Sequence, residues 1–354
     1  MSNSEWMRRC LVLAAQAKGW TSPNPLVGAV VLDANGLLVS EGFHKGPGQW
    51  HAERDALLKV SGTVPNGTVF VNLEPCCVWG RTPPCTDIII EKGIRNVYVG
   101  MLDPDPRMAG KGIKRLEEAG INVQVGLIEE ECRTLNAAYL LAREQKRPLV
   151  TLKVASTLDG RVSDTSGQSK WITGEAARAS GQRLRAEHDA ILVGVGTVIK
   201  DDPQLNVRLE NGPPIRPVIL DTHLRTPQDA KIHTSGLKPW FYTHHASANA
   251  NGWDVRTVPL DSTGLSFQAV LADLCSRDVY SVLVEGGASI ASSILQTGLV
   301  DRLELFMAPK FLGGGLIWGD GLKLPLALAS QFEIREHAIL DQDIWLRLES
   351  KKHV

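Results

Sequence analysis

Short apolar strands and helical segments alternate along the first 125 residues, and this alternation leaves few possible architectures. The strand candidates include "VGAVVLD", "TVFVNL" and "NVYVGM", and helical stretches such as "GIKRLEEAG" lie between them. Strands separated by helices of about 10 to 15 residues are typical of βαβ units around a largely parallel sheet. The sequence therefore predicts an α/β fold.

The alternation stops after an expected helix at about residues 129–145 and then begins again. The charged segment "REQKRP", residues 143–148, separates the two series, and the second includes "LVTLKVAS", "DAILVGV", "PVILD" and "YSVLVEGG". A chain of 354 residues is also longer than a single hydrophobic core usually supports. We expect two α/β domains, at residues 1–146 and 147–354.

Composition excludes several classes of protein. A net charge of -1 provides no bulk attraction to nucleic acid or to anionic membranes. No apolar run approaches the roughly 18 residues that cross a bilayer, and the N-terminal run from Cys10 to Ala15 is shorter than the core of a signal peptide. Six cysteines are too few for a disulfide scaffold and favour metal binding or catalysis. We expect a cytoplasmic protein without a nucleic-acid or membrane partner.

Three of the six cysteines lie within "LEPCCVWGRTPPC", residues 73–85, and "HAE" stands upstream of them. A His-x-Glu pair followed by Pro-Cys and a further Cys is the signature of zinc deaminases. One imidazole and two thiolates leave a tetrahedral zinc ion with an open position for water. The pattern predicts His51, Cys76 and Cys85 as zinc ligands, with Glu53 as the carboxylate that moves protons.

The eight residues between Cys76 and Cys85 exceed the usual spacing in that signature. Thr82 is a possible helix N-cap and Pro83 suits a first helical position, which places Cys85 in the first turn of a helix ending at Gly93. The helix dipole there would favour the thiolate. An alternative is a structural zinc site, in which Cys77 supplies a fourth protein ligand.

The segments "TSPNPLVGAVV", "GFHKGPGQWHAE", "NLEPCCVWGRTPPC" and "GMLDPDPRMAGKGI" resemble the deaminase domain of the bifunctional deaminase/reductase family of riboflavin biosynthesis. The resemblance implies a cytidine-deaminase-like three-layer domain that removes an amino group hydrolytically from a diaminopyrimidinone ribosylamino 5'-phosphate. It accounts for the cysteine spacing, which the family shares. It also implies that Asn24 and His44 contact the substrate and that Arg81 lies near its phosphate.

The chain departs from the family pattern around this site. After the first cysteine ligand the family usually has Ser or Ala and then His, whereas this chain has Cys77, Val78 and Trp79. Trp50 replaces a usual Pro, and Asp105 replaces a usual Asn. A pyrimidine could stack on either tryptophan, and an Asp105 that faced the pocket would repel a phosphate. A second alternative therefore keeps the fold but has the deaminase act on a different pyrimidine nucleotide.

Residues 149–209 are similar throughout to the reductase domain of the same family, which has a dihydrofolate-reductase-like α/β fold. The resemblance implies hydride transfer from NADPH to C1' of the ribosyl group, and homo-oligomers are usual in the family. It places Lys153 and Asp201 at the reacting ribose. The implied substrate-binding residues are Ser169, Arg185, Leu205, Arg208 and Glu285. The implied cofactor-binding residues are Ser156, Trp171, Thr197, Asp201, Gly286, Gly287, Ala288 and Ser289.

Local chemistry is compatible with these roles. Arg185 and Arg208 are donors suited to a phosphate, and neither lies in an obvious series of ion pairs. A strand, a glycine pair and a helix start in "VLVEGGASI" can present free N–H groups to a phosphate, although the glycines could also form a plain turn. "KDDP" could likewise be a plain turn. No Gly-x-Gly-x-x-Gly motif is present, which disfavours a standard Rossmann site.

Overall fold

The computed structural model describes residues 1–245 and 252–351. The chain divides into two compact units, Met1–Lys146 and Arg147–Val354. The division falls within the charged segment at residues 143–148. Among the described residues, no helix is both long enough and apolar enough to cross a membrane.

The first unit is built on a five-stranded sheet with the order β2-β1-β3-β4-β5. Its strands are β1 (Gly28–Leu32), β2 (Leu38–Phe43), β3 (Thr68–Val71), β4 (Asn96–Val99) and β5 (Asn122–Val125). β3, β4 and β5 are parallel, whereas β1 runs antiparallel to both of its neighbours. The short connection between β1 and β2 explains this hairpin, because only antiparallel strands can be joined by a tight turn.

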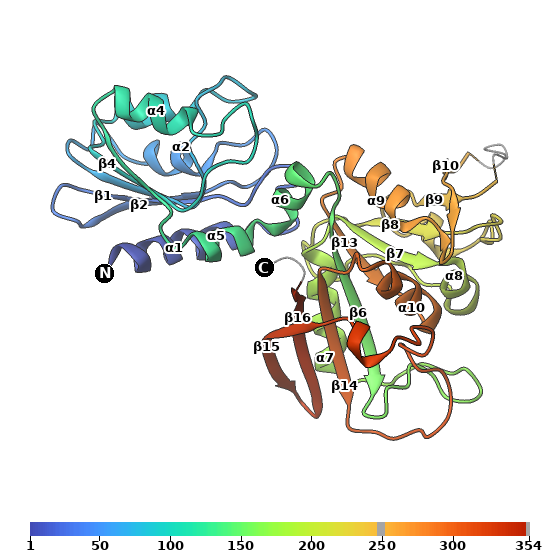
Figure 1. The fold of residues 1–354 in the computed structure, drawn as a ribbon. Helices are drawn as coiled ribbons and strands as arrows, with labels where there is room; N and C mark the ends of the chain where they lie inside the picture. Colours follow the sequence, from blue (N-terminus) through green and yellow to red (C-terminus); the bar gives the residue numbers. More distant parts are fainter. Residues whose placement is uncertain (246–251, 352–354) are drawn as a thin grey trace. The chain divides into compact units, whose positions relative to one another are not determined.

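Helices cover both faces of this sheet and give the predicted three layers (Figure 1). One face carries α1 (Asn3–Ala15) and α5 (Glu129–Leu135). The other face carries α2 (Ala52–Leu57), α3 (Cys85–Glu91) and α4 (Lys111–Glu118). Every residue of β1 is buried between the layers.

The single helix expected at about residues 129–145 is two helices, α5 and α6 (Ala137–Glu144), which meet at Asn136. The Asn136 side chain explains the break. Its Oδ1 accepts a hydrogen bond from Leu26 N at 2.8 Å, and its Nδ2 donates to Leu26 O at 3.0 Å. Asparagine favours such bonds to backbone groups over a helix interior.

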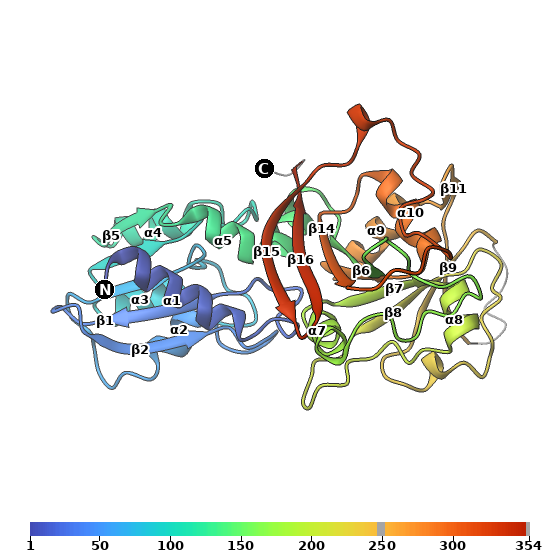
Figure 2. The same ribbon diagram turned by 90° about the horizontal axis from the view of Figure 1, so that it is seen from below.

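The second unit contains a nine-stranded sheet with the order β10-β9-β8-β7-β13-β6-β14-β16-β15. The strands are β6 (Leu149–Thr157), β7 (Ala190–Gly194), β8 (Arg216–Leu220), β9 (Trp240–Thr243), β10 (Asp254–Thr257), β13 (Ser281–Glu285), β14 (Arg302–Ala308), β15 (Phe332–Leu340) and β16 (Asp343–Ser350). Seven strands from β10 to β14 run parallel. β16 lies beside β14 and runs antiparallel to it, and β15 pairs antiparallel with β16 at the edge of the sheet (Figure 2).

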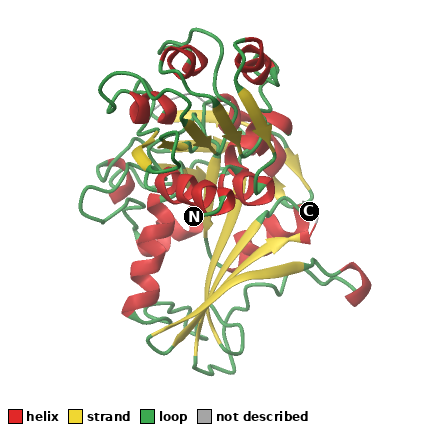
Figure 3. Cartoon of the chain, turned by 90° about the vertical axis from the view of Figure 1, so that its left-hand side faces the viewer, coloured by secondary structure: helices red, strands yellow, loops and turns green. Residues whose placement is uncertain are grey.

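Helices also lie on both sides of this sheet (Figure 3). Apolar residues of α9 (Phe267–Ser276) and α10 (Ala288–Thr297) join those of β6, β7 and β13 in the main core. On the opposite face, Ala177 and Leu184 of α7 (Glu175–Ala186) pack on Leu283 and Phe306. The predicted α/β domain is therefore present, although sequence reasoning missed α8 (Val195–Asp201), which follows β7 without a loop.

A buried ion pair joins the start of the second unit to its own sheet. Arg147 donates to both carboxylate oxygens of Asp301 at 2.7 Å, and the two side chains are only 12% and 5% exposed. Asp301 also accepts a hydrogen bond from Val150 N at 2.8 Å. This arrangement fixes the first residues of β6 beside the start of β14.

Replacing Asp301 by Asn should lower the free energy of unfolding by about 3–5 kcal/mol, because it leaves the buried Arg147 guanidinium without its counter-charge. Urea denaturation followed by circular dichroism measures the loss. As a control, Glu131→Gln breaks the exposed Arg8–Glu131 pair, whose side chains are 55% and 44% exposed, and should cost less than about 1 kcal/mol. Equal losses in the two variants would contradict the role of Asp301.

Candidate active sites

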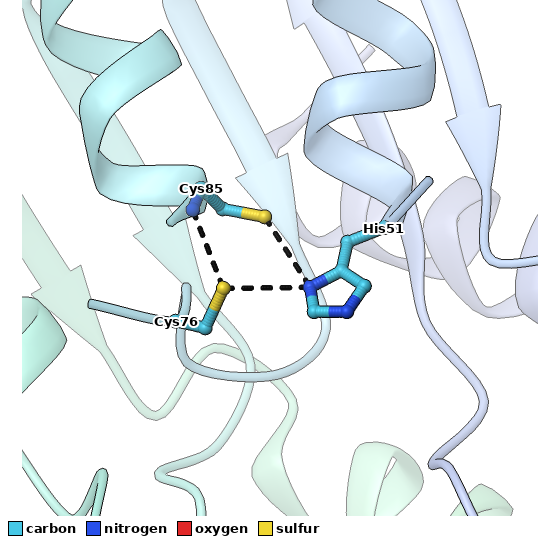
Figure 4. A group of neighbouring side chains, drawn as sticks. All are labelled: His51, Cys76 and Cys85. Atoms are coloured by element: carbon cyan, nitrogen blue, oxygen red, sulfur yellow. Dashed lines mark hydrogen bonds between the residues drawn. The ribbon is translucent and has the colours of Figure 1, made fainter. Parts of the chain in front are cut away.

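His51, Cys76 and Cys85 meet at one end of the first sheet, as the sequence predicts. One ligand atom from each lies within 4.8 Å of the others. Figure 4 shows His51 Nδ1 facing both sulfurs, at 3.4 Å from Cys76 Sγ and 3.5 Å from Cys85 Sγ. One imidazole nitrogen and two thiolate sulfurs are the donors that zinc prefers, and three protein ligands leave a fourth position open.

Two helix starts and one loop bring these three residues together. His51 is the N-cap of α2, Cys85 is the first residue of α3, and Cys76 lies in the loop after β3. Cys85 N donates to Cys76 Sγ at 3.3 Å. The hydrogen bonds that Cys76 receives from Cys85 and His51 lower the pKa of its thiol to about 4, so this sulfur is ready to bind a cation as a thiolate.

The predicted capping of α3 is wrong. Pro84 is the N-cap, no side chain caps the helix, and Pro83 lies before it. Thr82 instead approaches a predicted metal ligand, with its hydroxyl 3.5 Å from His51 Nε2. The physical reason is that α3 begins at Cys85 and not at Pro83, so Thr82 lies before the helix, where its hydroxyl contacts the imidazole. The predicted end of the helix before Gly93, which has φ 76°, is correct.

Glu53 is the second residue of α2 and lies beside the ligand group, with only 3% of its surface exposed. Burial, together with the negative charge of Cys76, raises the pKa of its carboxyl group to about 7. A carboxyl group of this kind can both accept and donate a proton near neutral pH.

Cys77, the extra cysteine, is not part of the metal-binding group among the described residues. It is half-buried, and its backbone carbonyl accepts a hydrogen bond from Arg115 Nη1 at 3.3 Å. Burial raises the pKa of its thiol. The pKa of the Cys85 thiol is also raised, through its hydrogen bond with Cys76 and through burial and contrary to the expected effect of the helix dipole, so the position of Cys77 and not its pKa sets it apart from the group. The four-coordinate structural alternative therefore lacks its fourth ligand.

A hydrogen-bonded pair, Asn24 and His44, stands beside the ligand group. His44 Nδ1 lies 3.1 Å from the backbone oxygen of Trp50, which can only accept, so Nδ1 carries the proton. His44 Nε2 then accepts from Asn24 Nδ2 at 2.9 Å. Burial lowers the pKa of His44 and favours this neutral form. The chain of contacts fixes the orientation of the Asn24 amide.

The departures from the family pattern fall into two groups. Asp105 does not repel a phosphate as an unpaired charge would, because Arg107 binds it through Nε at 3.0 Å and through Nη2 at 2.6 Å. The contact lowers the pKa of Asp105 to about 2. Val78 and Trp79 are 46% and 75% exposed, and Arg81 is exposed in the same loop, so these side chains are accessible to a ligand.

Three charged residues gather on the α7 face of the second sheet. Lys153 of β6 and Glu285 of β13 are register partners, so their side chains share one face. Arg185 of α7 donates to both oxygens of Glu285 at 2.9 and 2.8 Å, and to Asn206 O at 3.2 Å. Arg185 is thus ion-paired, contrary to the expectation from the sequence. Local sequence patterns could not show this pair, because Arg185 and Glu285 are 100 positions apart.

Burial and the neighbouring charges shift the pKa values of this group. Burial lowers the pKa of Lys153. Burial alone would raise the pKa of Glu285, but the positive charges of Arg185 and Lys153 lower it to about 2. Arg208 is exposed, and among the described residues its side chain makes no hydrogen bond or ion pair, which leaves its guanidinium available to an anion.

Other predicted reductase residues lie on loops and helix ends of the same unit. Asp201 ends α8, 3.9 Å from Lys170 Nζ, and no hydrogen bond or ion pair in the described chain joins it to Lys153. Trp171 is 67% exposed, with the Arg178 guanidinium 4.7 Å from its ring. Thr197 is half-buried in the first turn of α8. The remaining predicted positions are Ser156 and Leu205, which are buried, and Ser169, which is half-buried.

The turn from β13 to α10 has the form that the sequence predicts. Gly286 and Gly287 connect Glu285 to Ala288, the first residue of α10, and Ser289 follows in its first turn. No side chain caps this helix, so its first N–H groups are free to bind an anion. A side chain at Gly286 would come within 2.9 Å of Ile290 Cβ, which explains the need for glycine there.

Sequence reasoning missed several residues that hold these sites in place. Glu74 accepts hydrogen bonds from Gly110 N and Gly112 N, each at 2.9 Å, and so fixes the loop before α4. Lys310 donates to Ile172 O at 2.6 Å and to Trp171 O at 3.4 Å. No local sequence pattern indicates the hydrogen bonds of Glu74 or of Lys310. The only clue is that Glu74 directly precedes the Pro-Cys motif.

Comparison with known families covers both units. The family model described as "Cytidine and deoxycytidylate deaminase zinc-binding region" matches residues 1–101. The model described as "RibD C-terminal domain" matches residues 148–343. The first match contains all three predicted zinc ligands, and the second contains the Lys153–Glu285–Arg185 group.

Full-length relatives agree with these matches. "Riboflavin biosynthesis protein RibD" of Actinobacillus pleuropneumoniae is 40% identical and covers 98% of this chain and 95% of its own length. Its namesake from Aquifex aeolicus is 42% identical over 90% of each chain.

Solved structures share the whole fold. A Thermotoga maritima "diaminohydroxyphosphoribosylaminopyrimidine deaminase/5-amino-6-(5-phosphoribosylamino)uracil reductase" aligns with a TM-score of 0.90 at 35% identity, covering 98% of both chains. Acinetobacter baumannii RibD aligns equally well, with a TM-score of 0.90 at 37% identity and 98% coverage of both chains. This chain therefore belongs to the RibD family of riboflavin biosynthesis proteins.

Proposed function

We propose that this chain is a bifunctional enzyme of riboflavin biosynthesis. Residues 1–146 deaminate a diaminopyrimidinone ribosylamino 5'-phosphate hydrolytically, and residues 147–354 then reduce its ribosyl group to a ribityl chain with NADPH. The observation that carries the proposal is the His51–Cys76–Cys85 group beside the buried Glu53, in a chain that matches relatives of both activities over its full length.

Each of the deaminase residues has its own proposed role: metal binding, proton transfer or substrate positioning. Zinc bound by His51, Cys76 and Cys85 would lower the pKa of a water molecule. Glu53 would accept the proton of that water and return it to the departing amino nitrogen, because the pKa of its buried carboxyl group is raised to about 7. One C–O bond replaces one C–N bond, water is consumed and ammonia leaves. Asn24, held by His44, positions the pyrimidine.

The reductase residues hold the substrate and move protons while NADPH supplies the hydride. C1' of the ribosyl group gains the hydride, its bond to the ring oxygen breaks, and that oxygen gains a proton. Lys153 is suited to donate this proton because burial weakens its hold on it. Asp201 is proposed at the same ribose, Arg208 binds the 5'-phosphate, and the N-terminus of α10 binds the cofactor pyrophosphate.

Two finer points belong to this proposal. The substrate is a small pyrimidine nucleotide, and the exposed Val78 and Trp79 are where its identity could differ from that of the relatives. We further propose that the enzyme is cytoplasmic and forms homo-oligomers, as the family resemblance implies.

Metal analysis of purified variants tests the ligand set. Cys76→Ser and Cys85→Ser should each lose most of the bound zinc, because each removes one of three ligands, whereas Cys77→Ser should keep it. Inductively coupled plasma mass spectrometry gives the zinc content of each chain. Loss of zinc in Cys77→Ser with retention in Cys85→Ser would favour the structural four-coordinate site.

Replacing Glu53 by Gln should reduce ammonia release by about 10²- to 10⁴-fold, because the amide cannot carry the proton. Zinc content and NADPH oxidation with already deaminated substrate should not change. Glu117→Gln, which alters an exposed carboxylate on α4, is the matched control and should retain full activity. Ammonia release that survives in Glu53→Gln would disprove its catalytic role.

Lys153→Met should slow NADPH oxidation by at least about 10²-fold, since it removes the proposed proton donor. Ammonia release should stay at the wild-type rate because the residue lies in the other unit. Lys114→Met, at a position 76% exposed on α4, provides the control. Stopped-flow absorbance of NADPH measures the step, and an unchanged rate would exclude Lys153 from the reaction.

A further inference from the structure

A row of charged side chains crosses five strands on the α7 face of the second sheet. Lys153 of β6 stands between two glutamates, because its register partners are Glu285 of β13 and Glu304 of β14. The row continues through Arg347 of β16 to Glu336 of β15. Register partners point to the same face, and neighbouring strands lie about 4.8 Å apart, so the side chain of either glutamate can reach that of Lys153.

Glu304 is fully buried, and both of its carboxylate oxygens are occupied. Arg347 Nε donates to Oε1 at 2.6 Å, and Trp345 Nε1 donates to Oε2 at 2.7 Å. Arg347 also donates through Nη1 to Glu336 at 2.8 Å, and its side chain is only 18% exposed. Because β16 and β6 lie on opposite sides of β14, these contacts hold the Glu304 carboxylate on the side away from β6.

Lys153 is left without a counter-ion of its own. Arg185 binds Glu285 on one side of the lysine, and Arg347 binds Glu304 on the other. Among the described residues, Lys153 Nζ makes no hydrogen bond or ion pair. An ammonium group removed from water without a partner holds its proton weakly, in agreement with the lowered pKa of Lys153.

Other charged and titratable groups lie on the elements packed around this row. Both ring nitrogens of His188, which follows α7, are within hydrogen-bond distance of other groups, and Arg302 of β14 binds Glu349 of β16 at 3.1 Å. In the described sheet, neither Arg302 nor Glu349 is a register partner of Lys153. The remaining groups are Glu187, Arg208 and the Asp201–Lys170 pair.

We propose that Arg347 is a positioning residue of the reductase site: it holds the Glu304 carboxylate on the β16 side of β14, so that the Lys153 amine stays unpaired and can act at the reacting ribose. Without Arg347, a buried carboxylate would remain beside a lysine that lacks a counter-ion, and the two would pair. This inference rests on the proposed reductase function, in which Lys153 donates the proton.

The pH profile of kcat for NADPH oxidation tests the proposal. A proton donor must carry its proton, so the rate falls on the alkaline side as the pH rises through the pKa of Lys153. In full-length Arg347→Gln, the pairing with Glu304 should raise that pKa, and the alkaline limb should move up by about 1 pH unit or more. Arg347→Lys keeps a cation beside Glu304 and should keep the wild-type profile.

A double variant separates this effect from damage to the β15–β16 hairpin. Glu304→Gln/Arg347→Gln removes both charges and should return the alkaline limb to its wild-type position. Glu304→Gln alone leaves the Arg347 charge without its partner, which should move the limb down. Arg335→Gln, which breaks ion pairs with Glu333 and Glu349 on the same hairpin, is the matched control. A double variant as strongly shifted as Arg347→Gln would overturn the proposal.

Direct titration of Lys153 distinguishes this inference from the proposed reaction. Lys153 is half-buried, so acetic anhydride can reach its amine. Competitive acetylation at a series of pH values, followed by mass spectrometry of the peptide that contains Lys153, gives its pKa without turnover. An unchanged pKa in Arg347→Gln would overturn the inference alone. A raised pKa with an unshifted alkaline limb would support the inference and exclude Lys153 as the proton donor.

Discussion

The close approach of three chain segments around Cys76 is the constraint on which the first unit depends. A side chain at Gly112 would come within 2.1 Å of Pro75 O, so only glycine lets α4 lie against the cysteine loop. A side chain at Gly42 would come within 2.5 Å of both Ala52 O and Ala56 N, so β2 can touch α2 directly. These contacts bring the start of α2, with His51 as its cap, to the same sheet end as Cys76 and Cys85.

In the second unit, the proposed reactive site is built on buried charged side chains, whereas in the first it is built on buried cysteines. Burial would raise the pKa of Glu285, but the positive charges of Arg185 and Lys153 lower it, and burial lowers the pKa of Lys153. Arg147 and Asp301 form a separate buried pair that fixes the start of β6, the strand that carries Lys153. In both units, contacts that stabilise the fold also hold the residues proposed to be reactive.

Much of this could be predicted from the sequence, because the relevant signals are local. Apolar periodicity located most strands, and the order of His51, Glu53, Cys76 and Cys85, together with the family resemblance that explains the cysteine spacing, identified the metal-binding group. Long-range contacts could not be predicted: Arg185 with Glu285 and Asn136 with Leu26 join residues 100 and 110 positions apart. Helix α8 was missed because it lacks both a side-chain cap and a preceding loop. The cap assigned to Thr82 failed because Pro84 occupies that position.

In the proposed function, one chain performs two reactions in a fixed order. The most direct measurement follows ammonia and NADPH together after the wild type is mixed with the diaminopyrimidinone phosphate. The account predicts ammonia release with or without NADPH, and NADPH oxidation that follows it in equal amount. Oxidation of NADPH on the undeaminated substrate without ammonia release would contradict it.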